Sequence, residues 1–212
     1  INNAQFLTEN HPFAGWKKTH HIVDRVISLQ LETYKIVLLP YVPDGRFQEA
    51  LLTLPEGFQD ARIIFGHQLL NGAKMGAITA KDVEEWKLDY PMVVSGHVHD
   101  KQMPQPNLYY TGSSLQVAYG EREDHTIALV HLDTLQIEEI DINPPTKKTL
   151  YLDISKIGEM KLPAQENTKY KLSISGDAEE FKTFRKTDKY KELVKNGVKV
   201  VFKQKREVPV NL

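Results

Sequence analysis

Short apolar segments separated by turn residues run along the chain, and their periodicity predicts strands. Residues 21–29 alternate and contain a β-branched run that includes Ile22, Val26 and Ile27. Residues 61–65 and 92–94 are largely apolar, which is typical of strands buried on both faces of a sheet. The same pattern predicts further strands over 33–39, 109–111, 125–132, 135–142, 149–154, 170–175 and 198–202.

Helical spacing is present between these strands. Residues 46–54 place four apolar side chains on one face, and Thr79 to Asp82 resembles a capping box that opens a helix to about residue 88. Strand, helix and strand at this spacing predict an α/β sheet.

A third helix is predicted over 177–196. It begins at Asp177, with Glu180 three residues on, and ends at Asn196-Gly197. Residues 2–9 resemble the end of a further helix.

The run Asn143-Pro144-Pro145-Thr146 breaks the chain and predicts a boundary between a domain over 1–145 and a domain over 147–212. Charge supports the division, because 147–212 holds 16 Lys and Arg against 9 Asp and Glu, whereas the whole chain has a net charge of −1. Such a contrast suggests that the basic part faces a polyanion. A lysine-rich, solvated helix face is the alternative.

The composition of the chain excludes several kinds of site. With 41 % hydrophobic and 26 % charged residues, it is an ordinary globular sequence. The absence of cysteine excludes disulfides, thiolate metal sites and a cysteine nucleophile, so any metal must be held by histidine, carboxylate or amide groups. Apolar runs such as 36–39 are far shorter than a membrane helix, and we expect a cytoplasmic protein without a membrane partner.

Two of the buried strands end in the same way, in a glycine followed by a histidine. Residues 63–65 lead to Gly66-His67, and residues 93–95 lead to Gly96-His97-Val98-His99. Ligands of open α/β sheets bind outside the carboxyl ends of the strands, so neighbouring strands would bring His67, His97 and His99 to one place. Neutral imidazoles there are typical metal ligands. The alternative is a cluster of turn histidines bonded to backbone, and a bare His-x-His is a weak signal alone.

These motifs resemble the last two metal motifs of the calcineurin-like metallophosphoesterases. The segment Tyr110 to Ser114, followed by a hairpin, resembles the DNA-repair nuclease branch of the SbcD type, in its phage-like form. The resemblance implies an α/β calcineurin-like sandwich over 1–145 and a small α+β capping domain that touches DNA over 147–212.

The resemblance also implies the chemistry. His67 and His97 would bind one metal ion and His99 a second, in a two-metal DNA nuclease that uses manganese and works in recombination and repair with an SMC-like ATPase of the SbcC type. It leaves room for a homodimer. Two such ions clamp the phosphate during phosphodiester hydrolysis.

The family's earlier motifs, Asp-x-His, Gly-Asp and Gly-Asn-His-Asp, do not precede Gly66-His67 in this chain. The resemblance therefore implies a C-terminal piece of such a protein. No catalytic residue is expected in the chain itself, because the general-acid histidine and the bridging aspartate belong to the N-terminal half. We accordingly expect the chain to be inactive alone.

Polar loop and helix residues are candidates for contact with a DNA backbone. They are Asn71, Lys74, Ser113, Ser114, Lys182, Arg185, Lys186 and Lys189. Trp16, Trp86, Tyr109, Tyr110 and Tyr119 can stack on bases, although such aromatics more often belong to a core. Two other functions are open: a different calcineurin-like enzyme, such as a phosphatase or cyclic-nucleotide phosphodiesterase, or a non-catalytic fragment for DNA binding or assembly.

Overall fold

A computed structural model describes residues 8–164 and 166–205, and most of the predicted 2–9 helix end lies outside them. The described chain forms two compact units. The first unit takes residues 8–114 and 126–142, and the second takes 115–125 and 143–205. Residues 115–125, which the sequence assigned to the 1–145 domain, therefore belong with the second unit.

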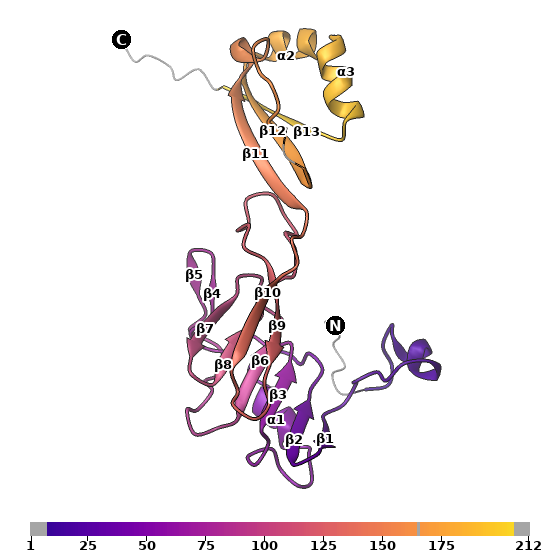
Figure 1. Ribbon diagram of the computed structural model, residues 1–212, viewed down its shortest axis with the longest axis vertical. Helices are drawn as coiled ribbons and strands as arrows, with labels where there is room; N and C mark the ends of the chain where they lie inside the picture. The colour runs from indigo at the N-terminus through magenta and orange to yellow at the C-terminus, as the bar shows by residue number, and fades with distance from the viewer. Residues whose placement is uncertain (1–7, 165, 206–212) are drawn as a thin grey trace. The chain divides into compact units, whose positions relative to one another are not determined.

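A six-stranded mixed sheet organises the first unit (Figure 1). Four central strands are parallel, and the first and last strands of the order are antiparallel edges. In spatial order the strands are β1 (Ile27–Leu31), β2 (Tyr34–Leu38), β3 (Ile63–Gly66), β6 (Met92–Ser95), β8 (Leu108–Tyr110) and β7 (Gln102–Gln105). The α/β class predicted from the sequence is compatible with this sheet.

Both faces of this sheet are buried, as the apolar runs predict. One face packs on helix α1 (Phe47–Leu51) and the buried Phe58 and Trp86. The other face packs on the hairpin of β9 (Thr126–Val130) and β10 (Ile137–Asp141), which the sequence predicted. Full burial of an aliphatic side chain contributes about 1.5–3 kcal/mol, so these two layers stabilise the strand ends that carry the histidines.

The predicted helix over 79–88 is wrong. Thr79 pairs with Lys74 in a small hairpin of β4 (Lys74–Met75) and β5 (Ile78–Thr79), and turns follow. Glu84 instead serves another helix, because its carboxylate accepts hydrogen bonds from the backbone N–H groups of Phe47 (2.8 Å) and Gln48 (3.0 Å) at the start of α1. Tertiary capping of α1 has overridden the local capping signal.

The N-terminal part of the first unit is mostly irregular. Residues 21–26, predicted as the beginning of a strand, lie outside β1, and a 3-10 turn occupies Ala14–Lys18. Asp24 is buried and contacts His11 (3.2 Å) and Lys17, which satisfies a carboxylate that would otherwise be costly to bury. No helix in the described part of the chain is long and apolar enough to cross a membrane.

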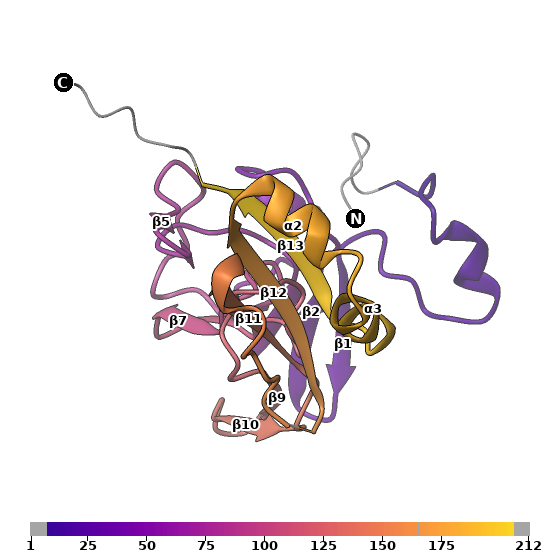
Figure 2. The same ribbon diagram turned by 90° about the horizontal axis from the view of Figure 1, so that it is seen from above.

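The second unit is a three-stranded parallel sheet with two helices. The strands lie in the order β11 (Thr146–Asp153), β12 (Thr168–Gly176) and β13 (Lys199–Gln204), and a 3-10 turn follows β11 at Ile154–Lys156. Leu172 and Ile174 of the central strand are fully buried with Phe184 and Leu193 of the helices. Figure 2 shows these helices over the sheet from above.

Residues 115–125 are anchored to this second sheet by their side chains. Gln116 is buried, and its amide contacts the backbone of Lys147 at the start of β11. Lys147 in turn donates through Nζ to the carbonyls of Gln116 (2.6 Å) and Val117 (2.8 Å). The Tyr119 hydroxyl donates to the carbonyl of Tyr170 in β12 (3.4 Å).

The predicted helix over 177–196 is two helices, α2 (Ala178–Phe184) and α3 (Asp188–Lys195). Asp177 caps the first as predicted, accepting from Glu179 N–H (2.8 Å) and Glu180 N–H (3.0 Å). The break is stabilised by Thr187, whose hydroxyl donates to the Phe184 carbonyl (2.7 Å) and accepts from Tyr190 N–H (3.3 Å). One side chain thus ends α2 and begins α3.

Replacing Thr187 with alanine should destabilise the start of α3 by about 1 kcal/mol, because both bonds of its hydroxyl are lost. Native-state amide hydrogen exchange at Tyr190 and Lys191 measures the effect. Thr187→Ser keeps the hydroxyl and should stay close to the wild-type protection. Equal protection in the alanine and serine variants would contradict the role of Thr187.

Candidate metal centre

Two neighbouring strands position His67 and His97. β3 and β6 pair in parallel with Gly66 opposite Ser95, and Gly96 N–H donates to the Gly66 carbonyl (3.3 Å). The residues that follow these strands therefore leave the sheet at the same edge, so the condition under which the sequence brought the histidines together is met for these two strands.

The two imidazoles lie side by side at this edge. Their ring centroids are 5.1 Å apart with an interplanar angle of 72°. The absence of a side chain at Gly96 permits this approach, because a Cβ there would lie 3.4 Å from His67 Nδ1. Closely placed imidazoles at a sheet edge are suited to hold one metal ion.

Tyr41 completes the cluster and was not assigned to it from the sequence. It follows β2 and stacks on His97, with centroids 5.9 Å apart and planes at 8°, while its ring meets His67 edge-on at 6.4 Å. The signal in the sequence is an aromatic residue just after a buried strand, at the same edge as both histidines. Tyr41 restricts the orientation of the His97 ring.

A buried hydroxyl locks the two strand ends together. Ser95 Oγ accepts from Gln68 N–H (2.8 Å), donates to the Gln68 carbonyl (2.8 Å) and accepts a longer bond from His97 N–H (3.4 Å). Ser95 and Gln68 are almost fully buried. Nearby, the Tyr110 hydroxyl accepts from Leu70 N–H (2.9 Å), and burial raises the pKa of Tyr110 to about 12. The backbone after both strands is thus fixed by satisfied polar groups.

His99 is more exposed than His97 and lies on the same loop. The loop after β8 holds this segment, because Ser113 N–H donates to the His99 carbonyl (3.0 Å). Gly112 has φ +70°, and a Cβ there would lie 2.9 Å from that carbonyl. Among the described residues, no group of three or more His, Cys, Asp or Glu is arranged to hold a metal ion, so His67 and His97 are the pair that the structure brings together.

The electrostatics of the pair favour neutral imidazoles. His67 is exposed to solvent on one side, and its partial desolvation, followed by the nearby His97 and His99, lowers its pKa below the usual 6.5. Burial also lowers the pKa of His97, against the opposing effect of Asp44. Neutral imidazole is the form that binds metal.

One polar atom of the pair lacks a partner. Nδ1 of His97 is buried and has no hydrogen-bond partner among the described residues. Leaving such an atom unsatisfied costs about 1–3 kcal/mol, so a ligand or metal ion at this position would be stabilising. Imidazole nitrogen is a ligand that divalent transition metals accept.

Several of the loop residues predicted to contact DNA form hydrogen bonds within the protein. The Asn71 side chain donates to the Lys81 carbonyl (3.2 Å), which fixes the loop after β3. Lys74 is exposed on β4, and its backbone bonds to the Gln102 side chain (2.7 and 2.8 Å). Ser113 holds the loop after β8, and Ser114 is exposed beside it.

Of the four basic residues of the second unit that were predicted to contact DNA, two make contacts within the protein and two are exposed. Lys182 pairs with Glu179 (2.6 Å), and Lys189 donates to the carbonyls of Gly158 and Met160 (2.8 Å each). Arg185 and Lys186 are exposed in the break between α2 and α3. The helices thus present fewer unpaired cations than their sequence suggests.

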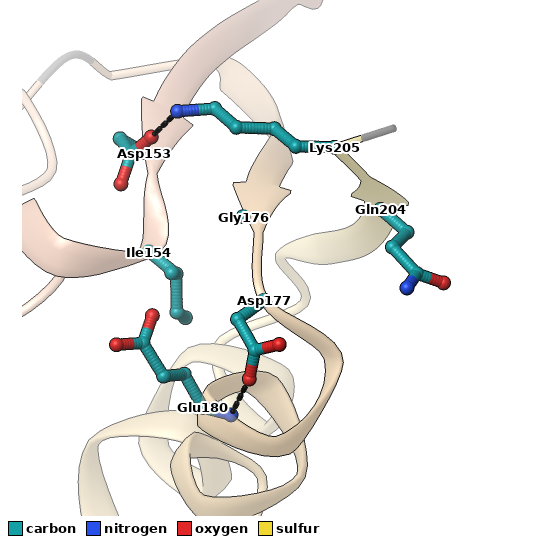
Figure 3. Close-up of a pocket in the computed structure, with 7 residues that line it drawn as sticks. All are labelled: Asp153, Ile154, Gly176, Asp177, Glu180, Gln204 and Lys205. Atoms are coloured by element: carbon teal, nitrogen blue, oxygen red, sulfur yellow. Dashed lines mark hydrogen bonds and ion pairs between the residues drawn. The ribbon is translucent and has the colours of Figure 1, made fainter. Parts of the chain in front are cut away.

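The carboxyl ends of the second sheet border an open pocket of about 910 Å³ (Figure 3). Three of its charged groups have partners within the unit: Lys205 pairs with Asp153, and Asp177 caps α2. Lys205 and Ser155 hold the pKa of Asp153 well below its usual range. Among the described residues that line this pocket, no buried side-chain nitrogen or oxygen lacks a hydrogen-bond partner as His97 Nδ1 does. The first unit therefore carries the stronger candidate site. The pocket is lined by Asp153, Ile154, Gly176, Asp177, Glu180, Gln204 and Lys205.

Comparison with known proteins assigns the chain to a family. It is 39 % identical over 217 residues to "Putative phosphoesterase 078R" of Invertebrate iridescent virus 3. The matched region covers 99 % of the chain and 62 % of that protein. It is 34 % identical over 195 residues to "Putative phosphoesterase 244L" of Invertebrate iridescent virus 6, covering 87 % of the chain and 69 % of that protein. The chain belongs to the family of these phosphoesterases. No family model matches the sequence.

The chain thus spans about two thirds of the length of these viral relatives. Its family agrees with the metallophosphoesterase resemblance at the level of phosphoester chemistry. The names of the relatives do not specify a metal, DNA or a partner.

Replacing Ser95 with alanine should lower the free energy of unfolding of the first unit by about 1–3 kcal/mol, because the buried Gln68 amide and carbonyl lose their partner. Urea unfolding followed by tryptophan fluorescence measures this, since both tryptophans lie in the first unit. The exposed Ser114→Ala is the control, with an expected change within about 0.5 kcal/mol. Similar losses in both variants would contradict the role of Ser95.

The stability of the first unit should fall as the pH is lowered below the usual histidine pKa of 6.5. The lowered pKa values of His67 and His97 mean that the unfolded chain binds protons that the folded unit does not, so their contribution is complete above that pH and is lost below it. Urea midpoints across this range measure the loss, and His67→Gln with His97→Gln should flatten it. Imidazole NMR titrations at or above pH 6.5 would contradict the expectation.

Proposed function

We propose that the chain supplies the histidine ligands of a metal-dependent phosphoester hydrolase whose substrate is DNA. The observation that carries the proposal is the His67–His97 pair at the carboxyl edge of the sheet, with a buried, unpartnered Nδ1 on His97. Membership of a family of phosphoesterases supports the reaction class.

In this proposal His67 and His97 hold one divalent metal ion and His99 contributes to a second, with manganese as the proposed metal. Bound ions would polarise the phosphoryl oxygens and provide a nucleophile at neutral pH. Tyr41 fixes the plane of the His97 ring, and Ser95 fixes the backbone that carries it. Such supporting contacts hold ligands in productive geometry.

DNA as the substrate rests on the resemblance to the SbcD-type nucleases and on the basic composition of residues 147–212. The calcineurin-like sandwich, the capping role of the second unit and work with an SMC-like ATPase are parts of the same proposal. A phosphatase or cyclic-nucleotide phosphodiesterase is the competing enzyme class, and substrate assays separate it from a nuclease.

One observation favours the non-catalytic alternative for the isolated chain. The described residues contain no group of three metal-binding side chains, whereas a two-metal site needs ligands for both ions. We therefore expect the 212-residue chain alone to bind manganese weakly and to hydrolyse no bis-p-nitrophenyl phosphate. Robust turnover by the mass-verified chain would contradict this expectation.

His97→Ala should abolish manganese-dependent hydrolysis of DNA and of bis-p-nitrophenyl phosphate by the complete gene product that contains this chain. The reason is that it removes a proposed metal ligand from the site. Metal content by mass spectrometry and initial rates are the measurements, and circular dichroism checks the fold.

His131→Ala is the matched control. His131 is exposed, and its Nε2 lies 3.6 Å from Oε2 of Glu138. It follows β9 in the hairpin, which is not one of the strands that carry His67 and His97. We expect the activity and metal content of the His131→Ala variant to equal those of the wild type. Equal losses in both variants, or full activity of His97→Ala, would contradict the proposed site.

A further inference from the structure

The second sheet has one covered face and one open face. Leu150 and Leu152 of β11, Leu172 and Ile174 of β12, and Val200 and Phe202 of β13 pack with the helices. Side chains alternate along a strand, so the residues between them point to the opposite face. We define the open face by Tyr151, Lys169, Lys171, Lys199 and Lys203; Ser173 lies in the same row as Tyr151 but is buried.

The open face concentrates positive charge, because the carboxylate that alternation along the described strands places there, that of Asp153, is already paired with Lys205. Lys171 and Lys199 are direct neighbours across β12 and β13, and like charges opposite each other are destabilising. Lys169, Lys199 and Lys203 are exposed, and no ion pair is formed by them with the described residues. By contrast, Lys182 and Lys191 on the helices pair with Glu179 and Asp188. An anionic ligand would relieve the repulsion on the open face.

An exposed aromatic side chain lies among these lysines. Tyr151 is 78 % exposed, and its neighbours across the sheet in the same row are the smaller Ser173 and Val201. An exposed tyrosine ring presents a face on which a nucleic-acid base can stack. At the start of the sheet, Lys171 Nζ lies 5.7 Å from the centroid of the Tyr119 ring, so a second aromatic borders the lysine row.

We propose that the open face binds a single-stranded nucleic acid, with Lys169, Lys199 and Lys203 contacting phosphates and Tyr151 stacking on a base. A flat basic surface with an exposed aromatic suits unpaired bases, whose faces are free to stack, whereas the bases of a duplex are already stacked. The inference places nucleic acid on the sheet rather than on the helices. It rests on the proposed function, in which DNA is the substrate, and deepens it by naming the face and an unpaired strand; binding here needs neither metal nor His97.

The test measures binding of the full 212-residue chain to a fluorescent oligothymidine of about 15 nucleotides, within the usual size of such sites. Fluorescence anisotropy is recorded in EDTA, between about 50 and 200 mM salt. With metal removed, a failure of binding here is distinguishable from a failure of hydrolysis.

Tyr151→Ala should weaken binding about 5- to 150-fold through the loss of one stacked base. Lys199→Gln with Lys203→Gln should reduce the magnitude of the log–log salt slope by about 1.4, since each phosphate contact to a single strand contributes about 0.7. The matched control removes two exposed charges outside the open face by Lys156→Gln with Lys195→Gln, and should bind as the wild type does. Circular dichroism checks that every variant is folded.

Three results would overturn the inference. The first is no binding at the lowest salt. The second is a loss in the Lys156/Lys195 control that equals or exceeds the loss in the sheet variants, which would locate binding outside the open face. The third is unchanged affinity of Tyr151→Ala, or tighter binding of a duplex of equal length, either of which would exclude recognition of unpaired bases by this face.

Discussion

The parallel pairing of β3 with β6 is the constraint on which the candidate site depends. Gly66 lies opposite Ser95 in this register, so His67 and His97 leave the sheet together. A slip of one residue would turn each side chain of the slipped strand to the other face of the sheet and would move His67 and His97 out of step at the edge. The Ser95 hydroxyl adds a local lock to this register, since it bonds both the N–H and the carbonyl of Gln68.

The two sheets of the molecule use their carboxyl edges differently. In the first unit, the edge carries imidazoles whose pKa values are lowered and one buried nitrogen without a partner. In the second unit, the charged groups at the edge pair with one another or cap a helix. A buried polar atom without a hydrogen-bond partner is costly unless a ligand satisfies it. For this reason the edge of the first sheet is the better candidate for a functional site.

The sequence was informative wherever a signal was local and agreed with the packing. The buried runs before Gly66 and Gly96 became adjacent strands, and Asp177 became a helix cap. It misled where a tertiary contact took over a local signal, because Thr79 entered a hairpin and Glu84 capped a distant helix. The break at Thr187 was missed since its bonds are made across a turn that apolar spacing alone does not reveal.

Spatial relations across long separations were beyond local patterns. Tyr41 lies 56 residues before His97 in the chain, and its stacking follows from the order of the strands rather than from spacing. The same holds for Gln116, which hydrogen-bonds the backbone of Lys147, 31 residues later in the chain.

The excursion of residues 115–125 into the second unit makes the division between the units discontinuous in the chain. The polypeptide passes from one unit to the other at 114–115, 125–126 and 142–143, so three covalent links join them. A single proteolytic cut in any one link leaves the units tethered by the other two. A fragment that starts at residue 147 lacks Gln116 and Tyr119, and its first strand begins with a backbone group that has lost its native partner. During synthesis, residues 115–125 emerge before β11 and β12 exist, and must wait for strands made later before they can pack.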